Sequence, residues 1–263
     1  MNSILPVLLI LCVQHCAVLK TSAAGPPPHP AVGERYVPVD VRWDAPLYAT
    51  SFDDDSLDDW VLEGGKSMKI ADGRLVLETT PGDAVRKPTD NHLVCWLKKE
   101  VPADFLLEFG VCPVDRNRGL NIIFFSARGR GGESVFAPQL QPRTGLFGHY
   151  THGDLNNYHA SYWAGDRGTA HIRKNHGFAL VATGEDLVRS AGQGSFQTVR
   201  LHKRGGTIRL MVDDIISVTY DDDGKTHGPV WTHTGWIGLR QMARTIRCDY
   251  DDLKIFPLAP SNP

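Results

Sequence analysis

The chain has 263 residues, a length that allows one large domain with short tails. With 41% hydrophobic and 22% charged residues, its composition is that of an ordinary globular protein. The formal net charge is -2 and no cluster of Lys and Arg is present, so the phosphate-neutralising surface of a nucleic-acid binder is excluded and no nucleic-acid partner is expected.

The first residues predict export. Ile4–Leu19 is almost wholly apolar, and Ser22, Ala23 and Ala24 supply the small residues of a cleavage site. The apolar run is shorter than the roughly 20 residues of a bilayer span, although a retained anchor helix stays open as the alternative. We expect a signal peptide over residues 1–24, a periplasmic or extracellular location, and no membrane span after its removal.

A proline-rich stretch follows the apolar run. Gly25–Pro30 reads Gly-Pro-Pro-Pro-His-Pro and lacks apolar periodicity, so residues 25–40 are predicted to form an extended spacer. The folded domain is expected over residues 41–258, with a tail over residues 259–263. Near its start, Asp53–Trp60 is predicted to form one short helix.

Short apolar runs bounded by Gly, Asp, Asn or Pro predict β-strands throughout this domain. The predicted strands are Leu75–Glu78, His92–Lys98, Phe105–Cys112, Asn121–Ser126, His159–Trp163, His171–Arg173, Ala179–Thr183, Gln197–Lys203, Thr207–Val212, Ile215–Tyr220, Gly235–Gln241 and Cys248–Phe256. Arg204–Thr207 and Val212–Ile215 predict hairpin turns. About twelve strands in one domain need two packed sheets to bury their inner faces. The predicted fold is therefore all-β, a two-sheet antiparallel jelly roll.

Three cysteines would remain after the signal peptide is removed: Cys95, Cys112 and Cys248. Because three is odd, at least one thiol is unpaired or pairs between chains. Burial of all three as small apolar side chains is the alternative. No C-x-x-C motif is present, which argues against a zinc knuckle or a dithiol redox site.

Three segments carry a family resemblance: Tyr158–Trp163, Arg173–Ala182 and Gly235–Met242. Together they resemble the YesU-like family, a domain of unknown function, and the resemblance covers roughly Tyr48–Phe256. It implies a concanavalin A-like or galectin-like jelly roll. By association it also implies a role in breakdown of acidic polysaccharides, because bacterial members tend to accompany genes for that process. The family has no settled activity, so the resemblance does not choose between an enzyme and a binding module.

Glycoside hydrolysis requires two carboxylates that flank the scissile bond. Jelly-roll glycosidases of the laminarinase type place them on one strand as Glu-x-Asp-x-x-Glu or Glu-x-Asp-x-Glu. No Glu of this chain stands in either pattern. Hydrolysis by this route is therefore not predicted.

Elimination at a uronate sugar instead needs a base and groups that neutralise the developing charge. The predicted catalytic residues are His159, Tyr162, Arg173 and Arg240. Strand alternation puts His159 and Tyr162 on opposite faces, and His159 is favoured because Trp163 is expected on its face. The predicted substrate-binding residues are Tyr158, Trp163, Lys174, Trp236 and Gln241. The alternative is that the arginines pair with acids and the aromatic residues fill the core.

Five histidines crowd the middle of the chain and make a metal site one interpretation. They are His149, His152, His159, His171 and His176. No H-x-x-x-H helix supports this interpretation, and loop histidines without a metal are the alternative.

Acidic residues at the two ends of the domain predict a structural calcium ion, because hard oxygen ligands suit it. The predicted ligands are Asp53, Asp251 and Asp252, with Asp54 and Asp55 beside the first. A solvated acidic turn that caps a helix is the alternative. No cofactor besides calcium is expected.

Two functions stay open at this point. The first is an exported enzyme that acts on acidic polysaccharide by β-elimination, which a groove with His or Tyr beside Arg would favour. The second is a non-catalytic, lectin-like module, which an aromatic platform without such a pair would favour. The expected partner is an acidic polysaccharide or oligosaccharide. The sequence names neither the sugar and its linkage nor the oligomeric state.

Overall fold

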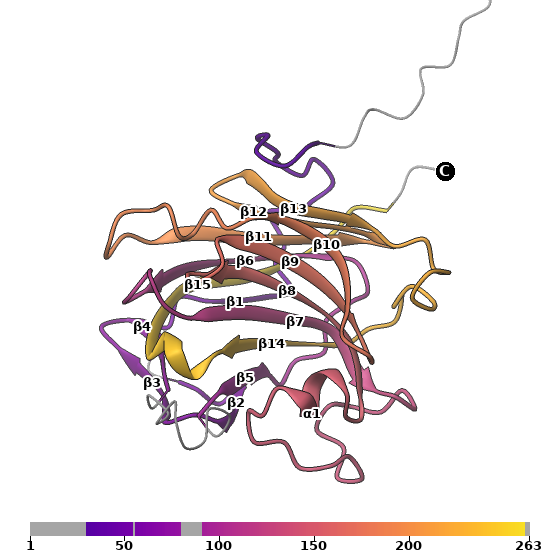
Figure 1. Cartoon of the computed structure of the whole chain (residues 1–263), viewed down its shortest axis with the longest axis horizontal. Coiled ribbons are helices and arrows are strands. Elements are labelled where there is room, and N and C mark those ends of the chain that lie inside the picture. Colours follow the sequence, from indigo (N-terminus) through magenta and orange to yellow (C-terminus); the bar gives the residue numbers. More distant parts are fainter. Residues whose placement is uncertain (1–29, 55, 80–90, 261–263) are drawn as a thin grey trace, which may run out of the picture.

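The structure, a computed structural model, describes residues 30–54, 56–79 and 91–260 (Figure 1). The predicted signal peptide and residues 25–29 of the predicted spacer lie outside these residues. Within them the chain forms fifteen strands, a one-turn helix α1 (Gly148–Thr151) and a 3-10 turn η1 (Ala243–Thr245). None of the described helices is long and apolar enough to cross a membrane.

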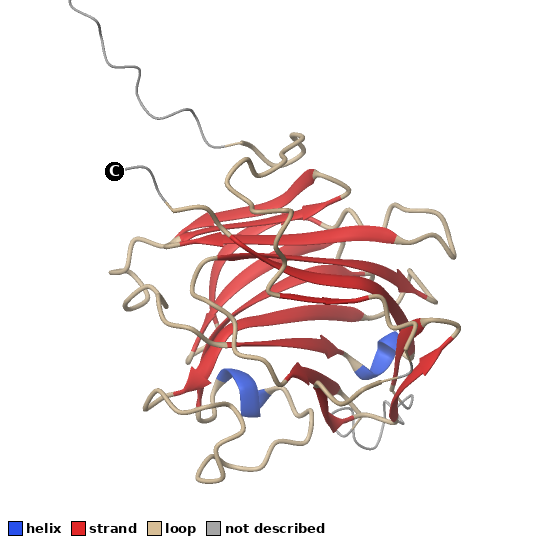
Figure 2. Ribbon diagram, turned by 180° about the vertical axis from the view of Figure 1, so that it is seen from behind, coloured by secondary structure: helices blue, strands red, loops and turns tan. Residues whose placement is uncertain are grey.

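The strands form two antiparallel sheets packed as two layers (Figure 2). The eight-stranded sheet has the order β13 (Ile215–Asp221), β12 (Thr207–Val212), β11 (Gln197–Arg204), β6 (Phe105–Pro113), β15 (Arg247–Pro257), β4 (Arg74–Glu78) and β3 (Ser67–Ala71), with β1 (Tyr48–Thr50) paired to β15. The seven-stranded sheet has the order β10 (Ala179–Glu185), β9 (Thr169–Asn175), β8 (Leu155–Ala164), β7 (Leu120–Gly129), β14 (Trp236–Gln241), β5 (Leu93–Leu97) and β2 (Trp60–Gly64). The predicted all-β, two-sheet jelly roll is confirmed.

The helix predicted over Asp53–Trp60 is wrong. Among the described residues of this stretch, side chains bond the backbone in turns: the Ser56 amide donates to Asp54 Oδ1 and the Asp58 amide to Ser56 Oγ. Such local bonds offer the backbone an alternative to the helix. Trp60 opens β2 instead, where its indole is buried in the core.

The main core lies between the two sheets and follows the two-residue period of the strands. On β6, Phe105, Leu107 and Phe109 point inward and are buried, as are Tyr158 and Tyr162 on β8. Each such side chain contributes about 1.5–3 kcal/mol relative to an exposed position.

The three described cysteines, Cys95, Cys112 and Cys248, are free and buried. Burial raises the pKa of each thiol. They therefore act as small apolar side chains and are poor nucleophiles.

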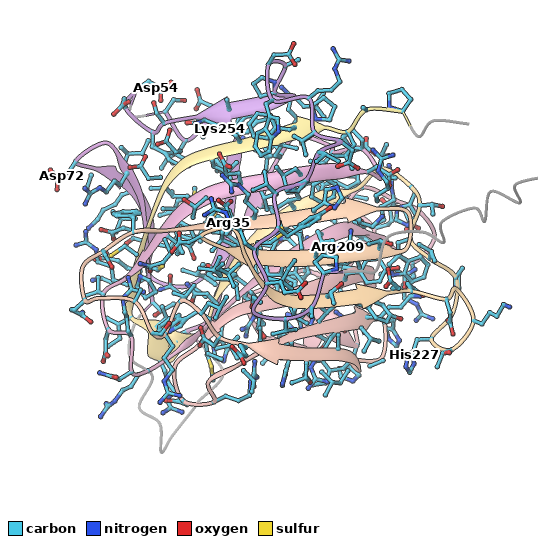
Figure 3. The ribbon with its side chains drawn as sticks, turned by 90° about the horizontal axis from the view of Figure 1, so that it is seen from above. Arg35, Asp54, Asp72, Arg209, His227 and Lys254 are labelled. Atoms are coloured by element: carbon cyan, nitrogen blue, oxygen red, sulfur yellow. The ribbon has the colours of Figure 1, made fainter. Side chains whose placement is uncertain are left out.

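The described part of the predicted spacer, residues 30–40, runs across the eight-stranded sheet near β12 and β13 (Figure 3). The Gly33 amide donates to the Ile216 carbonyl at 2.9 Å, and the Tyr36 amide donates to the Asp214 carbonyl at 2.7 Å. This segment covers the side of the sandwich opposite the seven-stranded sheet.

A buried ion pair locks β9 to the loop that follows β13. Lys174 Nζ lies 2.7 Å from Asp222 Oδ2, and the side chains are only 2% and 0% exposed. The Tyr158 hydroxyl donates to the same carboxylate oxygen, and Lys174 also donates to the Gly228 carbonyl. Burial raises the pKa of Asp222, but the bonds from Lys174 and Tyr158 outweigh it and hold the pKa below its ordinary value.

Replacing Lys174 with Met should cost about 3–5 kcal/mol of unfolding free energy, because it leaves a buried carboxylate without its cation. Guanidinium unfolding measures this change. The matched control is Lys254→Met, which removes the exposed Lys254–Asp252 pair (Figure 3) and should cost less than about 1 kcal/mol. Equal losses in the two variants would contradict the prediction.

Candidate functional site

A cavity of about 190 Å³ lies on the outer face of the seven-stranded sheet. It is lined by His92, Leu120, Ile122, Phe147, His159, Ser161, Arg167, His171, Arg173, Phe178, Arg240 and Met242. No carboxylate is among these lining residues. The lining thus combines cations, imidazoles and apolar side chains.

Register brings the strand residues of the cavity together in two neighbouring rows. The first row reads Arg240, Ile122, Ser161 and His171 from β14 to β9. The second row reads Gly238, Phe124, His159 and Arg173 over the same strands. Directly paired residues project from the same face, so these side chains are neighbours despite their separation in sequence.

Arg240 and Arg173 bind no described acid. Arg240 is only 3% exposed, its guanidinium carbon lies 4.2 Å from the centroid of the Phe147 ring, and its Nε has no hydrogen-bond partner among the described residues. Arg173 donates to the Phe178 carbonyl at 2.9 Å and stacks 3.9 Å from that ring's centroid. Cation–π contacts of this kind contribute about 0.5–2 kcal/mol each.

Arg167 reaches the cavity from the turn between β8 and β9. It donates to Ser161 Oγ at 2.8 Å and to Thr169, and it pairs with no described carboxylate. Burial lowers the pKa of Arg240 to about 10 and also lowers the pKa of Arg167 and of Arg173. All three remain cations at pH 7; Arg167 is exposed and Arg173 half-buried, whereas Arg240 is buried, and interior cations without a partner are rare. The cavity is therefore a site of positive potential.

Two asparagines fix the orientation of His159. The Tyr150 carbonyl can only accept, and it takes a 2.8 Å bond from Asn157 Nδ2. The Asn157 amide oxygen therefore faces Asn175 and accepts from its Nδ2 at 2.7 Å. The same Nδ2 donates to His159 Nδ1 at 2.9 Å. Since Nδ1 accepts, the proton of the neutral ring lies on Nε2.

The two histidines at the centre of the cavity are uncharged at neutral pH. Burial, reinforced by Arg173 and Arg240, holds the pKa of His159 well below its ordinary value. Burial and the charges of Arg167 and Arg173 lower the pKa of His171 to about 4. As arranged, His159 Nε2 is a hydrogen-bond donor, whereas a general base needs a free lone pair there.

Of the predicted catalytic residues, the structure brings His159, Arg173 and Arg240 together and leaves Tyr162 apart. Tyr162 is fully buried between the sheets, with its hydroxyl 3.1 Å from that of Tyr250. Trp163 is also fully buried in the main core, so it does not share the face of His159 as expected. The register between β7 and β8 shifts next to these residues, and such a bulge breaks the two-residue alternation.

The five predicted substrate-binding residues all lie away from the cavity lining. Trp163, Tyr158 and Lys174 are buried on the core side, and Gln241 also points inward, where it donates to a backbone carbonyl. Trp236 lies on the outer face, but at the opposite end of β14 from Arg240, and it does not line the cavity.

Sequence reasoning missed several lining residues because they come from loops, turns or strand ends. These are His92, Leu120, Phe147, Arg167, Phe178 and Met242. Alternation assigns faces only within strands, so it gives no signal for them. Phe178 and Met242 lie inside the second and third family segments, so the family resemblance was the one signal that could have found them.

No group of three or more His, Cys, Asp or Glu side chains that could hold a metal ion is found in the described ranges. The five histidines are divided: His159 and His171 line the cavity, His152 and His176 contact each other beside it, and His149 lies against Tyr150. Burial chiefly raises the pKa of Asp251, and the negative charges of Asp252 and Asp53 add to this rise. The predicted calcium ligands Asp53, Asp251 and Asp252 belong to no such group among the described residues, Asp55 lies outside them, and the calcium site stays a prediction.

We expect His159 to stay neutral around pH 6.5, the pH at which an ordinary histidine takes up a proton. Its single ring proton should stay on Nε2. Because its pKa is lowered in the folded state, the unfolded state takes up the proton first as pH falls. The unfolding free energy should therefore fall below about pH 6.5, by up to about 1.4 kcal/mol per pH unit for this residue.

Long-range ¹H–¹⁵N NMR of the ring nitrogens measures the protonation and tautomer of His159 directly. A ring that titrates near pH 6.5 would contradict the lowered pKa, and a neutral ring with its proton on Nδ1 would show that Asn157 and Asn175 do not set its orientation.

Comparison with known proteins gives the family. The profile of the family described as a domain of unknown function, DUF1961, matches residues 45–255. The uncharacterized protein YesU of Bacillus subtilis (strain 168) is 34% identical over 192 residues, which cover 70% of this chain and 83% of YesU. A Bacillus subtilis protein of unknown function with a galectin-like fold superposes with a TM-score of 0.72 and 30% identity, covering 82% of this chain and 98% of that one.

Two more distant structures share the fold alone. The carbohydrate-binding module CBM66 from Bacillus subtilis has a TM-score of 0.50 and 11% identity, covering 76% of this chain and 96% of its own. SCLam, a non-specific endo-β-1,3(4)-glucanase from family GH16, has a TM-score of 0.55 and 13% identity, and the match covers 86% of this chain and 95% of that one. The resemblance to the YesU-like family is confirmed, and the chain belongs to the family of the domain of unknown function DUF1961.

Proposed function

We propose that this protein binds an acidic glycan and that the cavity receives a sugar carboxylate. The observation that carries the proposal is the set of three arginines, Arg167, Arg173 and Arg240, around a cavity whose lining has no acid. A guanidinium binds a carboxylate through two parallel hydrogen bonds, so a uronate would supply the missing counter-charge. The likeness to a carbohydrate-binding module and a glucanase supports a glycan as the ligand.

The remaining lining suits the body of a sugar ring. Phe147 and Phe178 offer apolar surfaces against which the C–H face of a pyranose can pack. His159 Nε2 offers a donor to a ring or hydroxyl oxygen. An apolar wall with a few fixed polar groups is the usual composition of a small-ligand site.

The geometry supports binding better than catalysis. Hydrolysis needs two carboxylates, and the cavity lining contains none. For β-elimination the arginines would stabilise the enolate-like charge, which favours this reaction as a second candidate. However, the proton of His159 occupies the nitrogen that would act as base, and Tyr162 lies in the core. Elimination through His159 would require both asparagine amides to turn over.

Calorimetric titration should show that the protein binds oligogalacturonides or oligomannuronates and not their carboxyl-reduced counterparts, which keep the ring but lack the charge. Arg240→Met should weaken this binding at least about 10-fold, since a charge-assisted bond contributes about 1.5–3 kcal/mol. The same variant should be as stable as the parent or more stable, because it removes a buried cation without a described partner.

The matched control is Arg35→Met, which removes an exposed arginine on the segment that covers the opposite sheet and should leave binding unchanged (Figure 3). Absorbance near 235 nm, which detects unsaturated ends, should stay flat with both glycans. Equal binding of the carboxyl-reduced sugars, or parent-like binding by Arg240→Met, would refute the proposed site. A rising absorbance that depends on His159 would favour the lyase.

We further infer that the protein acts outside the cytoplasm, on the strength of the apolar run Ile4–Leu19 and the small residues after it. Mass spectrometry of protein secreted by its native host should find an N-terminus near Gly25. An intact Met1 in the cytosolic fraction would contradict this inference.

A further inference from the structure

The outer face of the seven-stranded sheet is only partly open. Next to the cavity, an aromatic stack fills the space above the strands: the Phe124 and Tyr150 ring centroids lie 5.4 Å apart, and those of Trp96 and Phe124 lie 6.0 Å apart. All three side chains are fully buried. Phe124 and Trp96 come from the sheet, whereas Tyr150 comes from α1 and is laid over them.

A carboxylate fastens this stack in place. Glu63 of β2 accepts from the Tyr150 hydroxyl at 2.8 Å and from Trp96 Nε1 at 3.0 Å. Arg143, in the loop before α1, binds the same carboxylate with two donors: Nη2 lies 2.6 Å from Oε1 and Nε lies 3.1 Å from Oε2. A bidentate pair with such low exposure holds the loop rigidly against the sheet.

The loop backbone also lies directly on the strands. A Cβ built on Gly145 would stand 1.8 Å from the His92 carbonyl oxygen, and one built on Gly64 would stand 2.3 Å from the Thr144 carbonyl oxygen. Only glycine permits so close an approach of two backbones. The loop is therefore a packed wall, with no passage beneath it at these positions.

This wall closes one end of a row that the cavity uses. The row runs through Trp96, Gly238, Phe124, His159 and Arg173, from β5 to β9. On the far side, the next paired residue is Leu180 of β10, which is 46% exposed. The row is thus blocked at the aromatic stack and has an open rim beyond Arg173.

We propose that the cavity recognises the terminal residue of an acidic glycan chain and does not accept an internal stretch. This inference rests on the proposed function and names the part of the glycan that the site takes. A chain bound along this row through an internal residue must leave it at both ends, and the stack and its wall leave only the end beyond Arg173 open. The volume of about 190 Å³ lies below the roughly 300–1,000 Å³ of pockets for drug-sized ligands, as expected for a single sugar ring.

The different burial of the arginines predicts how the terminal sugar is oriented in the cavity. Arg240, the most buried of the three, stands on the closed side against Phe147, whereas Arg173 stands on the side of β10. The carboxylate of the terminal sugar then meets Arg240, and the glycosidic bond leaves past Arg173 over Leu180.

Titration with oligogalacturonides and oligomannuronates of two, four and eight residues tests this inference on the intact protein. The dissociation constant per chain should be independent of length, with one protein bound per chain. Partial depolymerisation of a fixed mass of the polymer should raise the amount of protein bound in proportion to the number of ends. Arg240→Met should lose binding at every length, and Arg35→Met should keep it.

Affinity per chain that increases with length, or two or more proteins on one octamer, would overturn end recognition while leaving acidic-glycan binding intact. Binding to none of the oligomers or polymers would instead overturn the proposed function, and the end-recognition inference would fall with it.

Discussion

Arg240, itself only 3% exposed, carries a positive charge into a site that holds no anion among the described residues. Removing a charged group from water costs several kcal/mol unless a partner compensates it. The Phe147 ring, 4.2 Å away, returns only about 0.5–2 kcal/mol. The fold therefore maintains this cavity against a local loss of stability. The two-sheet core beneath it offsets that loss and holds the strand register that places Arg240 beside Ile122 and Ser161.

Strand β9 shows that the same sheet does pair a buried cation with an acid elsewhere, so the unpaired Arg240 is particular to the cavity. Lys174 and Arg173 are adjacent in sequence and point to opposite faces of the sheet. On the core side, Lys174 meets Asp222 at 2.7 Å, and a tyrosine hydroxyl completes the arrangement. On the cavity side, Arg173 meets a carbonyl and an aromatic ring, with no described acid. The chain supplies a carboxylate where structure requires one and omits it at the cavity, which is the distribution expected of a site whose anion arrives with a ligand.

The sequence predicted the parts of this arrangement that follow from alternation. His159, Arg173 and Arg240 lie in strongly patterned strands, so their shared face follows from the two-residue period. The prediction failed at Trp163, where a register shift between β7 and β8 turns the next side chain into the core. A bulge depends on the partner strand, which no local pattern reveals.

Long-range packing explains the other failures. The strands β1, β2 and β3 were not predicted. They are short, and their partners in the sheets specify them more than their own residues do. The acidic residues before β2 indicated a helix cap, yet the same side chains close turns. Phe147 and Phe178 enter the cavity from a loop and a turn, whose paths depend on what they pack against. The fold could be read from the sequence, whereas the closed shape of the site depends on contacts between segments far apart in the chain.

The one-turn helix α1 links the shape of the cavity to its hydrogen bonding. The Tyr150 ring belongs to the stack that closes the row, and its hydroxyl is fastened to Glu63. The Tyr150 carbonyl orients Asn157, and through Asn175 it leaves His159 Nδ1 as an acceptor. A displacement of this residue would open the wall and release the histidine tautomer together. Tyr150 therefore sets both the closed end of the cavity and the donor at its centre, His159 Nε2. A change at Tyr150 would alter the size of ligand that fits and the hydrogen bond offered to it at the same time.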